Sequence, residues 1–111
     1  MMKQQIITRI LLMLLMSMVG TKAMAYDIAV ENVEGVTIYY NYIKDGTVLE
    51  VVGRGSYSGN VNIPEEVTYM SRSRKVTRIG NEAFHRCIYL TTVTIPNSVT
   101  TIGVEAFCPC I

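Results

Sequence analysis

Two stretches near the C-terminus, VTRIGNEAFHRCI at 76–88 and VTTIGVEAFCPCI at 99–111, decide the fold. They share nine of 13 residues at an offset of 23, far more than chance gives. A weaker copy lies upstream, because VNIPEEVT at 61–68 resembles VTIPNSVT at 93–100 at an offset of 32. Self-similarity of this kind is typical of repeat architectures. The sequence therefore predicts a short repeat array over 61–111, with an incomplete last unit.

The two offsets differ by nine residues, so the first unit carries an insertion of that length around 69–76. The middle of the insertion, SRSRK at 71–75, is polar and basic. Such a composition predicts an exposed turn between short strands.

Each repeat unit has the pattern of one coil of a solenoid. A short strand at 90–95 precedes a Pro-Asn-Ser turn at 96–98, and Gly103 permits a tight bend before about one helical or 3₁₀ turn at 105–107. Stacked coils bury each other's apolar faces and pair their strands in parallel. Phe84 and Phe107 are then expected one above the other, about 4.8 Å apart. The predicted repeat core consists of Ile63, Val67, Ile79, Ala83, Phe84, Cys87, Leu90, Val93, Ile95, Val99, Ile102, Ala106, Phe107 and Cys110.

The segment before the repeats, 26–60, predicts a β-rich N-terminal cap. Two β-branched and aromatic runs at 36–43 and 47–52 flank an Asp45-Gly46 turn, which is a hairpin signal. After residue 26 the chain shows no sustained helical periodicity. The predicted fold class is mainly β, with an N-terminal hairpin segment followed by a short, incomplete solenoid of parallel strands and short helical turns.

From Ile79 to Gly103 the chain has the pattern IGxEAFxxCIxLxxVxIPxSVxxIG, which resembles the BspA-like leucine-rich repeat family of bacterial and protist surface proteins. The period of 23 lies within the leucine-rich-repeat range. The stretches at 38–41, 57–64 and 67–69 resemble the entry segment that precedes the first full repeat in such proteins. The resemblance implies an exported, cell-surface solenoid that mediates adhesion and protein binding. Its expected ligand is a host extracellular protein or a protein of a neighbouring cell.

Residues 1–25 have the pattern of a secretory signal peptide. Lys3 and Arg9 precede an apolar run at 10–19, and Ala23-Met24-Ala25 is a small-x-small cleavage motif. The apolar run is shorter than the roughly 20 residues that a membrane-spanning helix needs. Cleavage between Ala25 and Tyr26 is therefore expected, followed by secretion or display at the cell surface.

The charge balance excludes a basic nucleic-acid binder. All nine acidic residues lie after residue 25, and removing Lys3, Arg9 and Lys22 leaves seven basic residues, for a net charge of −2. No further apolar run is long enough to span a membrane once the signal is removed.

Residues capable of chemistry are few, and their spacing favours structural roles. His85 is the only histidine and lacks zinc-type ligand spacing, so neither a metal nor another cofactor is expected. Glu82 and Glu105 recur one repeat apart and are expected to stack as a solvent-facing column. Cys87 and Cys110 occupy equivalent positions, which leaves two interpretations open: a buried column of small residues or a disulfide between coils. We do not expect an enzyme; loss of an assayed activity on changing His85 or Cys108 would overturn that expectation.

The expected binding surface is the strand face, with Thr92 and Thr94 directed outward, supplemented by the aromatic Tyr40 of the cap. An alternative is that the chain is an N-terminal structural fragment of a longer repeat protein with no independent binding activity. Fewer than three full repeats are marginal for a solenoid, and an uncovered last coil favours self-association through the open repeat end.

Overall fold

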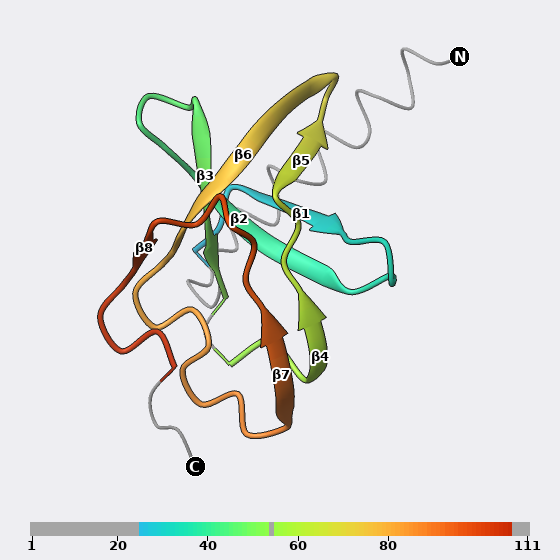
Figure 1. Ribbon diagram of the computed structural model, residues 1–111, viewed down its shortest axis with the longest axis vertical. Helices are drawn as coiled ribbons and strands as arrows, with labels where there is room; N and C mark the ends of the chain where they lie inside the picture. The colour runs from blue at the N-terminus through green and yellow to red at the C-terminus, as the bar shows by residue number, and fades with distance from the viewer. Residues whose placement is uncertain (1–24, 54, 108–111) are drawn as a thin grey trace, which may run out of the picture.

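The computed structural model describes residues 25–53 and 55–107, which form eight β-strands (Figure 1). These are β1 (Ile28–Glu31), β2 (Thr37–Ile43), β3 (Val48–Val52), β4 (Gly59–Asn62), β5 (Glu66–Tyr69), β6 (Arg72–Ile79), β7 (Leu90–Thr94) and β8 (Thr101–Ile102). Over these residues the chain forms no helix long and apolar enough to cross a membrane. The predicted mainly β fold class is confirmed.

The strands form two sheets. The larger one has the order β1-β2-β3-β6-β5, and β8 also pairs with β6; the smaller one contains β4 and β7. The strand β6 therefore connects the cap to the repeats, since it pairs in parallel with β3 and with β8.

The predicted cap hairpin is confirmed. Strands β2 and β3 pair antiparallel from Tyr39↔Val52 to Ile43↔Val48. The connecting turn has positive φ angles at Lys44, Asp45 and Gly46, the conformation that Asp-Gly turns favour. A strand that the sequence did not indicate, β1, adds to the outer edge of β2.

The sequence offsets between the repeats are also the register offsets between their strands. In the β4–β7 pair, Val61 lies beside Val93 and Asn62 beside Thr94, an offset of 32. In the β6–β8 pair, Ile79 lies beside Ile102, an offset of 23. Both pairs are parallel, as the stacked-coil prediction required.

The expected short helical turns at the Glu-Ala-Phe segments are non-helical turns instead. Glu82 and Glu105 have φ angles of 58° and 55°, and this left-handed backbone prevents a helix from propagating. Isolated turn bonds replace it, such as the bond from the Ala83 N–H to the Gly80 carbonyl at 3.2 Å.

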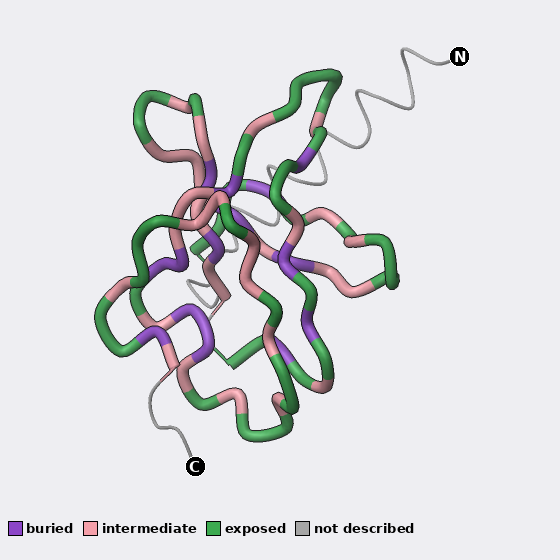
Figure 2. Tube along the Cα trace, in the orientation of Figure 1, coloured by how far each residue is buried: buried purple, intermediate pink, exposed green. Residues whose placement is uncertain are grey.

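The nine-residue insertion is a hairpin, and the predicted exposed turn at 71–75 was wrong in its extent. Residues 72–75 belong to β6, which pairs antiparallel with β5, and the turn itself is confined to Met70 and Ser71 with φ angles of 52° and 66°. The polar sequence suits a strand here because β6 projects beyond the core, where both of its faces meet solvent (Figures 1 and 2).

The core lies between the cap hairpin and the first repeat coil. Its fully buried side chains come from both regions and are Ile38, Tyr40, Leu49, Val51, Val61, Val76 and Ile79. The hairpin tips and outer loops are exposed (Figure 2). The cap and the first coil therefore share one hydrophobic core.

Candidate functional site

The outer face of the β4–β7 sheet is a polar surface built by two in-register strands. Val61 and Val93 point toward the core, so Asn60, Asn62, Thr92 and Thr94 point outward and are exposed. The Thr92 hydroxyl donates a hydrogen bond to the Asn60 Oδ1 across the sheet at 2.9 Å. Both threonines named from the sequence thus lie on one solvent-facing surface, which we call the Asn/Thr face.

Tyr40 is buried and does not extend the Asn/Thr face, in contrast to the sequence-based expectation. It is only 1% exposed, and burial raises the pKa of its phenol. Alternation along β2 places Ile38 and Tyr40 on one face, and both are buried because this face packs into the core that the cap shares with the first repeat coil. The half-buried Tyr39 lies on the opposite face, whereas Tyr42 shares the face of Ile38 and Tyr40 but is only half-buried near the end of β2, with the Arg74 guanidinium 4.6 Å from its ring.

A continuous row of aromatic rings joins the cap to the repeats. Ring centroids are separated by 4.9 Å for Tyr26–Tyr39, 5.9 Å for Tyr39–Tyr57, 4.8 Å for Tyr57–Phe84 and 5.1 Å for Phe84–Phe107. The two phenylalanines are parallel within 1°, which confirms the predicted stacking. We call these five residues the aromatic row.

Tyr57 is the junction of the aromatic row and was not identified from the sequence. Its hydroxyl donates a hydrogen bond to the Val52 carbonyl and accepts one from the Tyr39 N–H at 3.0 Å. Burial is the main reason that the pKa of its phenol is raised. The glycine- and serine-rich composition of 53–60 indicated a loop and gave no signal that one side chain within it is buried.

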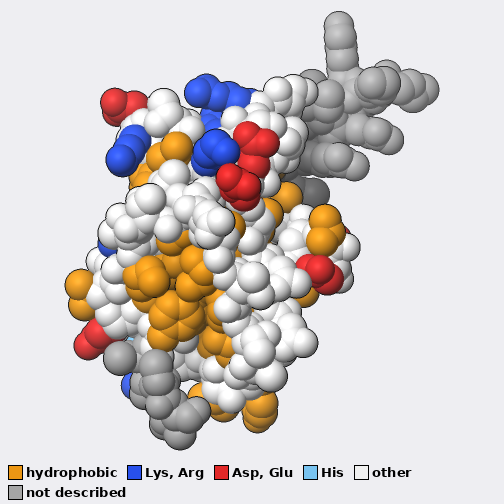
Figure 3. Space-filling model, in the orientation of Figure 1, with side chains coloured by type: hydrophobic (Ala, Val, Ile, Leu, Met, Phe, Trp, Pro, Cys, Tyr) orange, Lys and Arg blue, Asp and Glu red, His pale blue; other side chains and the backbone are white. Residues whose placement is uncertain are grey.

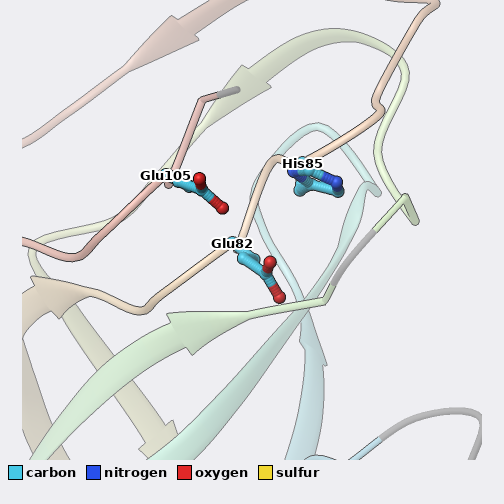
Figure 4. Close-up of side chains that lie close together, drawn as sticks. All are labelled: Glu82, His85 and Glu105. Carbon is cyan, nitrogen blue, oxygen red and sulfur yellow. The ribbon is translucent and has the colours of Figure 1, made fainter. Parts of the chain in front are cut away.

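The described residues bring one group of metal-ligating side chains together: Glu82, His85 and Glu105, with one ligand atom from each within 4.8 Å of the others (Figure 4). Carboxylates and an imidazole are ligands that zinc accepts. The sequence indicated the two stacked glutamates but not His85, whose position depends on the left-handed turn at Glu82. Arg86 Nε donates a hydrogen bond to His85 Nε2 at 3.2 Å, so this ring nitrogen would be available to a cation only after Arg86 moves.

Cys87 is half-buried and packs against the core. Cys108 and Cys110 lie outside the described residues, as do residues 1–24 of the predicted signal peptide. The choice between a cysteine column and a Cys87–Cys110 disulfide therefore remains a prediction.

The other predicted core residues fall into two groups. Those of the first coil and its flanks are buried, and these are Ile63, Val67, Ile79, Ala83 and Phe84, together with Ala106 of the second coil. Those nearer the last coil are half-buried, and these are Leu90, Val93, Ile95, Val99 and Phe107. Ile102 is 53% exposed and does not belong to the core, because β8 pairs with β6 on one side and with no described strand on the other.

Hydrophobic side chains gather between β8 and β7 on the face seen in Figure 3. This face is the open end of the repeat stack, where Ile102 and Val104 are 53% and 71% exposed. The arrangement offers contact surface rather than a reactive pocket.

The comparisons with known proteins agree with this geometry. Residues 60–111 match the family model described as "BspA type Leucine rich repeat region (6 copies)". The chain is similar to a leucine-rich repeat protein from Bacteroides ovatus ATCC 8483, with 34% identity, a TM-score of 0.62, and coverage of 77% of this chain and 21% of that one. It is also similar to a leucine rich cell surface protein from Faecalibacterium prausnitzii A2-165, with 28% identity, a TM-score of 0.54, and coverage of 76% and 21%.

The chain thus spans about a fifth of the length of these two solved structures. None of the curated proteins matches it significantly. The matched region contains the strand pairs β4–β7 and β6–β8, in which the residues that lie side by side are separated by the same offsets as the sequence repeats. Over residues 60–111 the chain therefore matches the BspA-type leucine-rich repeat family in both sequence and strand register.

Proposed function

We propose that the chain is part of an exported repeat protein of the cell surface that binds other proteins without catalysis and mediates adhesion. The support is the match of residues 60–111 to the BspA-type repeat family, together with the similarity to the leucine rich cell surface protein of F. prausnitzii. The expected partner is a host extracellular protein or a protein of a neighbouring cell.

The Asn/Thr face carries this proposal. Its four exposed side chains are uncharged, each has hydrogen-bonding atoms, and the parallel register aligns them in two pairs, Asn60–Thr92 and Asn62–Thr94. A fixed array of this kind presents donors and acceptors at strand spacing to a partner surface. Because its strands are held by the solenoid, little conformational entropy is lost on binding.

We also propose three segments for the chain: a signal peptide at 1–25, a β-rich cap at 26–60 and leucine-rich repeats at 61–111. Ala25 and Tyr26 are both exposed, which is compatible with cleavage between them. The intact mass of the native product tests export, since signal removal would lower the mass by that of residues 1–25.

Adhesion is tested by capture of the chain on a panel of immobilised extracellular-matrix proteins. In a double variant, Thr92→Lys with Thr94→Lys, two long charged side chains would cover the Asn/Thr face, and at least about a tenfold loss of affinity is expected. The matched control, Asn97→Lys with Thr101→Lys, adds the same charge at exposed positions outside that face. Equal binding by both double variants would contradict the proposed surface.

A second candidate is a purely structural role, in which the chain is the N-terminal piece of a longer repeat protein and has no binding activity of its own. It is favoured by the 21% coverage of the solved neighbours and by exposed Ile102 and Val104 at the open end. Light scattering over a dilution series tests it. Self-association through the open end supports this role, and a monomer at all concentrations contradicts it.

A further inference from the structure

The larger sheet curves so that its two edge strands, β1 and β5, border a groove of about 280 Å³. This groove lies apart from the Asn/Thr face and does not depend on the function proposed above. The side chains that matter for its chemistry are Val30, Glu31, Tyr40, Glu66, Val67 and Thr68.

The β5 side of the groove has outward-directed backbone groups. The Val76 N–H donates to the Glu65 carbonyl at 2.9 Å. This bond sets the alternation along β5 between residues that bond to β6 and residues that face away from it. By alternation, Val67 and Tyr69 also direct their backbone groups toward β6, whereas Glu66 and Thr68 direct theirs away from it. Both outward-directed residues of β5 line the groove.

The β1 side is also a sheet edge. The Asn32 N–H donates to the Val36 carbonyl at 2.9 Å, so by the same alternation Glu31 directs its backbone groups away from β2. Among the described residues, neither β1 nor β5 pairs with a second strand. At the Asn32 end of the groove, Asn32 Nδ2 donates a hydrogen bond to the Asn62 carbonyl at 3.0 Å.

The chemistry of the groove is apolar inside and acidic at the rim. Val67 and Tyr40 are buried and form its inner surface, whereas Glu31 and Glu66 are exposed on opposite walls. None of the described residues that line it is a lysine or an arginine. Lys75 pairs at 3.4 Å with Glu65, which is not part of the lining, and within the described part of the chain neither Glu31 nor Glu66 forms an ion pair.

We propose that this groove binds an extended peptide segment of a partner protein, in which an apolar residue is flanked by lysine or arginine. The peptide adds as a strand to the free edge of β5, a known mode of recognition in which the backbone gives affinity and alternate side chains give specificity. Its apolar residue lies beside Val67 and faces inward. Its basic residues flank the apolar one, lie on the same side of the sheet as the Glu66 side chain, and face the acidic rim.

The length of the peptide follows from the strand. Because β5 has four residues, the paired segment is about four to five residues, or roughly 15 Å at strand rise. So short a contact predicts weak binding, with a Kd of about 0.1–1 mM.

The test uses backbone amide NMR on the full-length chain. The probe is the blocked peptide acetyl-Lys-Val-Lys-Val-Lys-amide, and its counterpart has glutamate in place of lysine. The amides of Glu66 and Thr68 should shift on addition of the lysine peptide, because they would donate to it, while the amide of Val67 should shift less. The glutamate peptide should bind at least about tenfold more weakly.

Two variants at one position separate backbone pairing from side-chain effects. Thr68→Pro removes the outward N–H without interrupting the β6 ladder, since proline is tolerated at the open side of an edge strand. Thr68→Ala removes the hydroxyl that contacts Ser73 at 2.6 Å but keeps the N–H. Thr68→Ala should bind like the unchanged chain, and Thr68→Pro should lose binding while its amide spectrum stays folded.

If Thr68→Pro does not fold, Glu31→Gln with Glu66→Gln supplies the second test, with an expected loss of about threefold to tenfold. Equal binding of the lysine and glutamate peptides would overturn the proposal. So would shifts of Glu66 and Thr68 that depend on protein concentration without peptide, because they would assign the β5 edge to a second copy of the chain.

Discussion

The two repeat coils have nearly the same sequence but very different burial. Ile79 and Ile102 occupy equivalent positions and pair with each other, yet the first is 0% exposed and the second 53%. The strand β6 of the first coil lies between β3 and β8. The strand β8 of the second coil has only β6 beside it among the described strands. Burial in a solenoid thus depends on what covers each coil, and equal residues contribute unequally to stability.

The largest expected effect is at the aromatic row. Phe84 is 2% exposed and packs between Tyr57 and Phe107, so Phe84→Ala should lower the free energy of unfolding by about 3–5 kcal/mol. Phe107 is only half-buried, and Phe107→Ala should cost less than about half as much. Urea unfolding of the two variants measures the difference, and equal losses would show that the coils are covered equally.

The second comparison uses the isoleucine pair. Ile79→Ala should cost about 2–5 kcal/mol, because it leaves a cavity in the closed part of the core. Ile102→Ala should change the free energy of unfolding by less than about 1 kcal/mol, because half of its side chain already meets solvent. A large loss for Ile102→Ala would mean that the second coil is covered in solution.

The smallest expected effect is a fall in the free energy of unfolding at alkaline pH, which comes from the buried tyrosines of the core. Burial raises the pKa of Tyr40 and Tyr57 above the usual 10.0, so the folded chain keeps protons that the unfolded chain loses. Their stabilising contribution is complete below about pH 10 and falls as pH rises, by up to about 1.4 kcal/mol per tyrosine for each pH unit.

Urea unfolding at about pH 9 and about pH 11 measures this loss. Tyr57→Phe should reduce the difference between the two pH values, whereas Tyr42→Phe, at a half-buried tyrosine near the end of β2, serves as the control. The same slope in all three proteins would contradict the role of buried phenols.

The repeat register could be predicted from the sequence because one quantity, the offset between similar segments, also fixes which strand residues lie side by side. The hairpin could be predicted because Asp45-Gly46 favours a turn with positive φ. Both features depend on short-range chemistry or on periodicity.

Features that depend on neighbours across the fold were not predictable in the same way. Alternation placed Tyr39 and Tyr40 on opposite faces, but only the packing of the sheet decides that Tyr40 is buried. The polar stretch at 72–75 resembled a loop in sequence. It is a strand without an apolar face, because this part of β6 lies outside the core. His85 approaches the two glutamates through left-handed turns that residue types alone do not specify.

The β5–β6 hairpin has a practical consequence for engineering. The nine extra residues of the first unit lie in this hairpin, beside the stack. They lengthen the offset between Val61 and Val93 to 32, against 23 between Ile79 and Ile102, yet the two valines still lie side by side. Its tip, Met70 and Ser71, already has the left-handed backbone of a tight turn, and Met70 is 84% exposed. A fluorophore or an affinity epitope inserted between these two residues would project into solvent while the coils below retain their spacing.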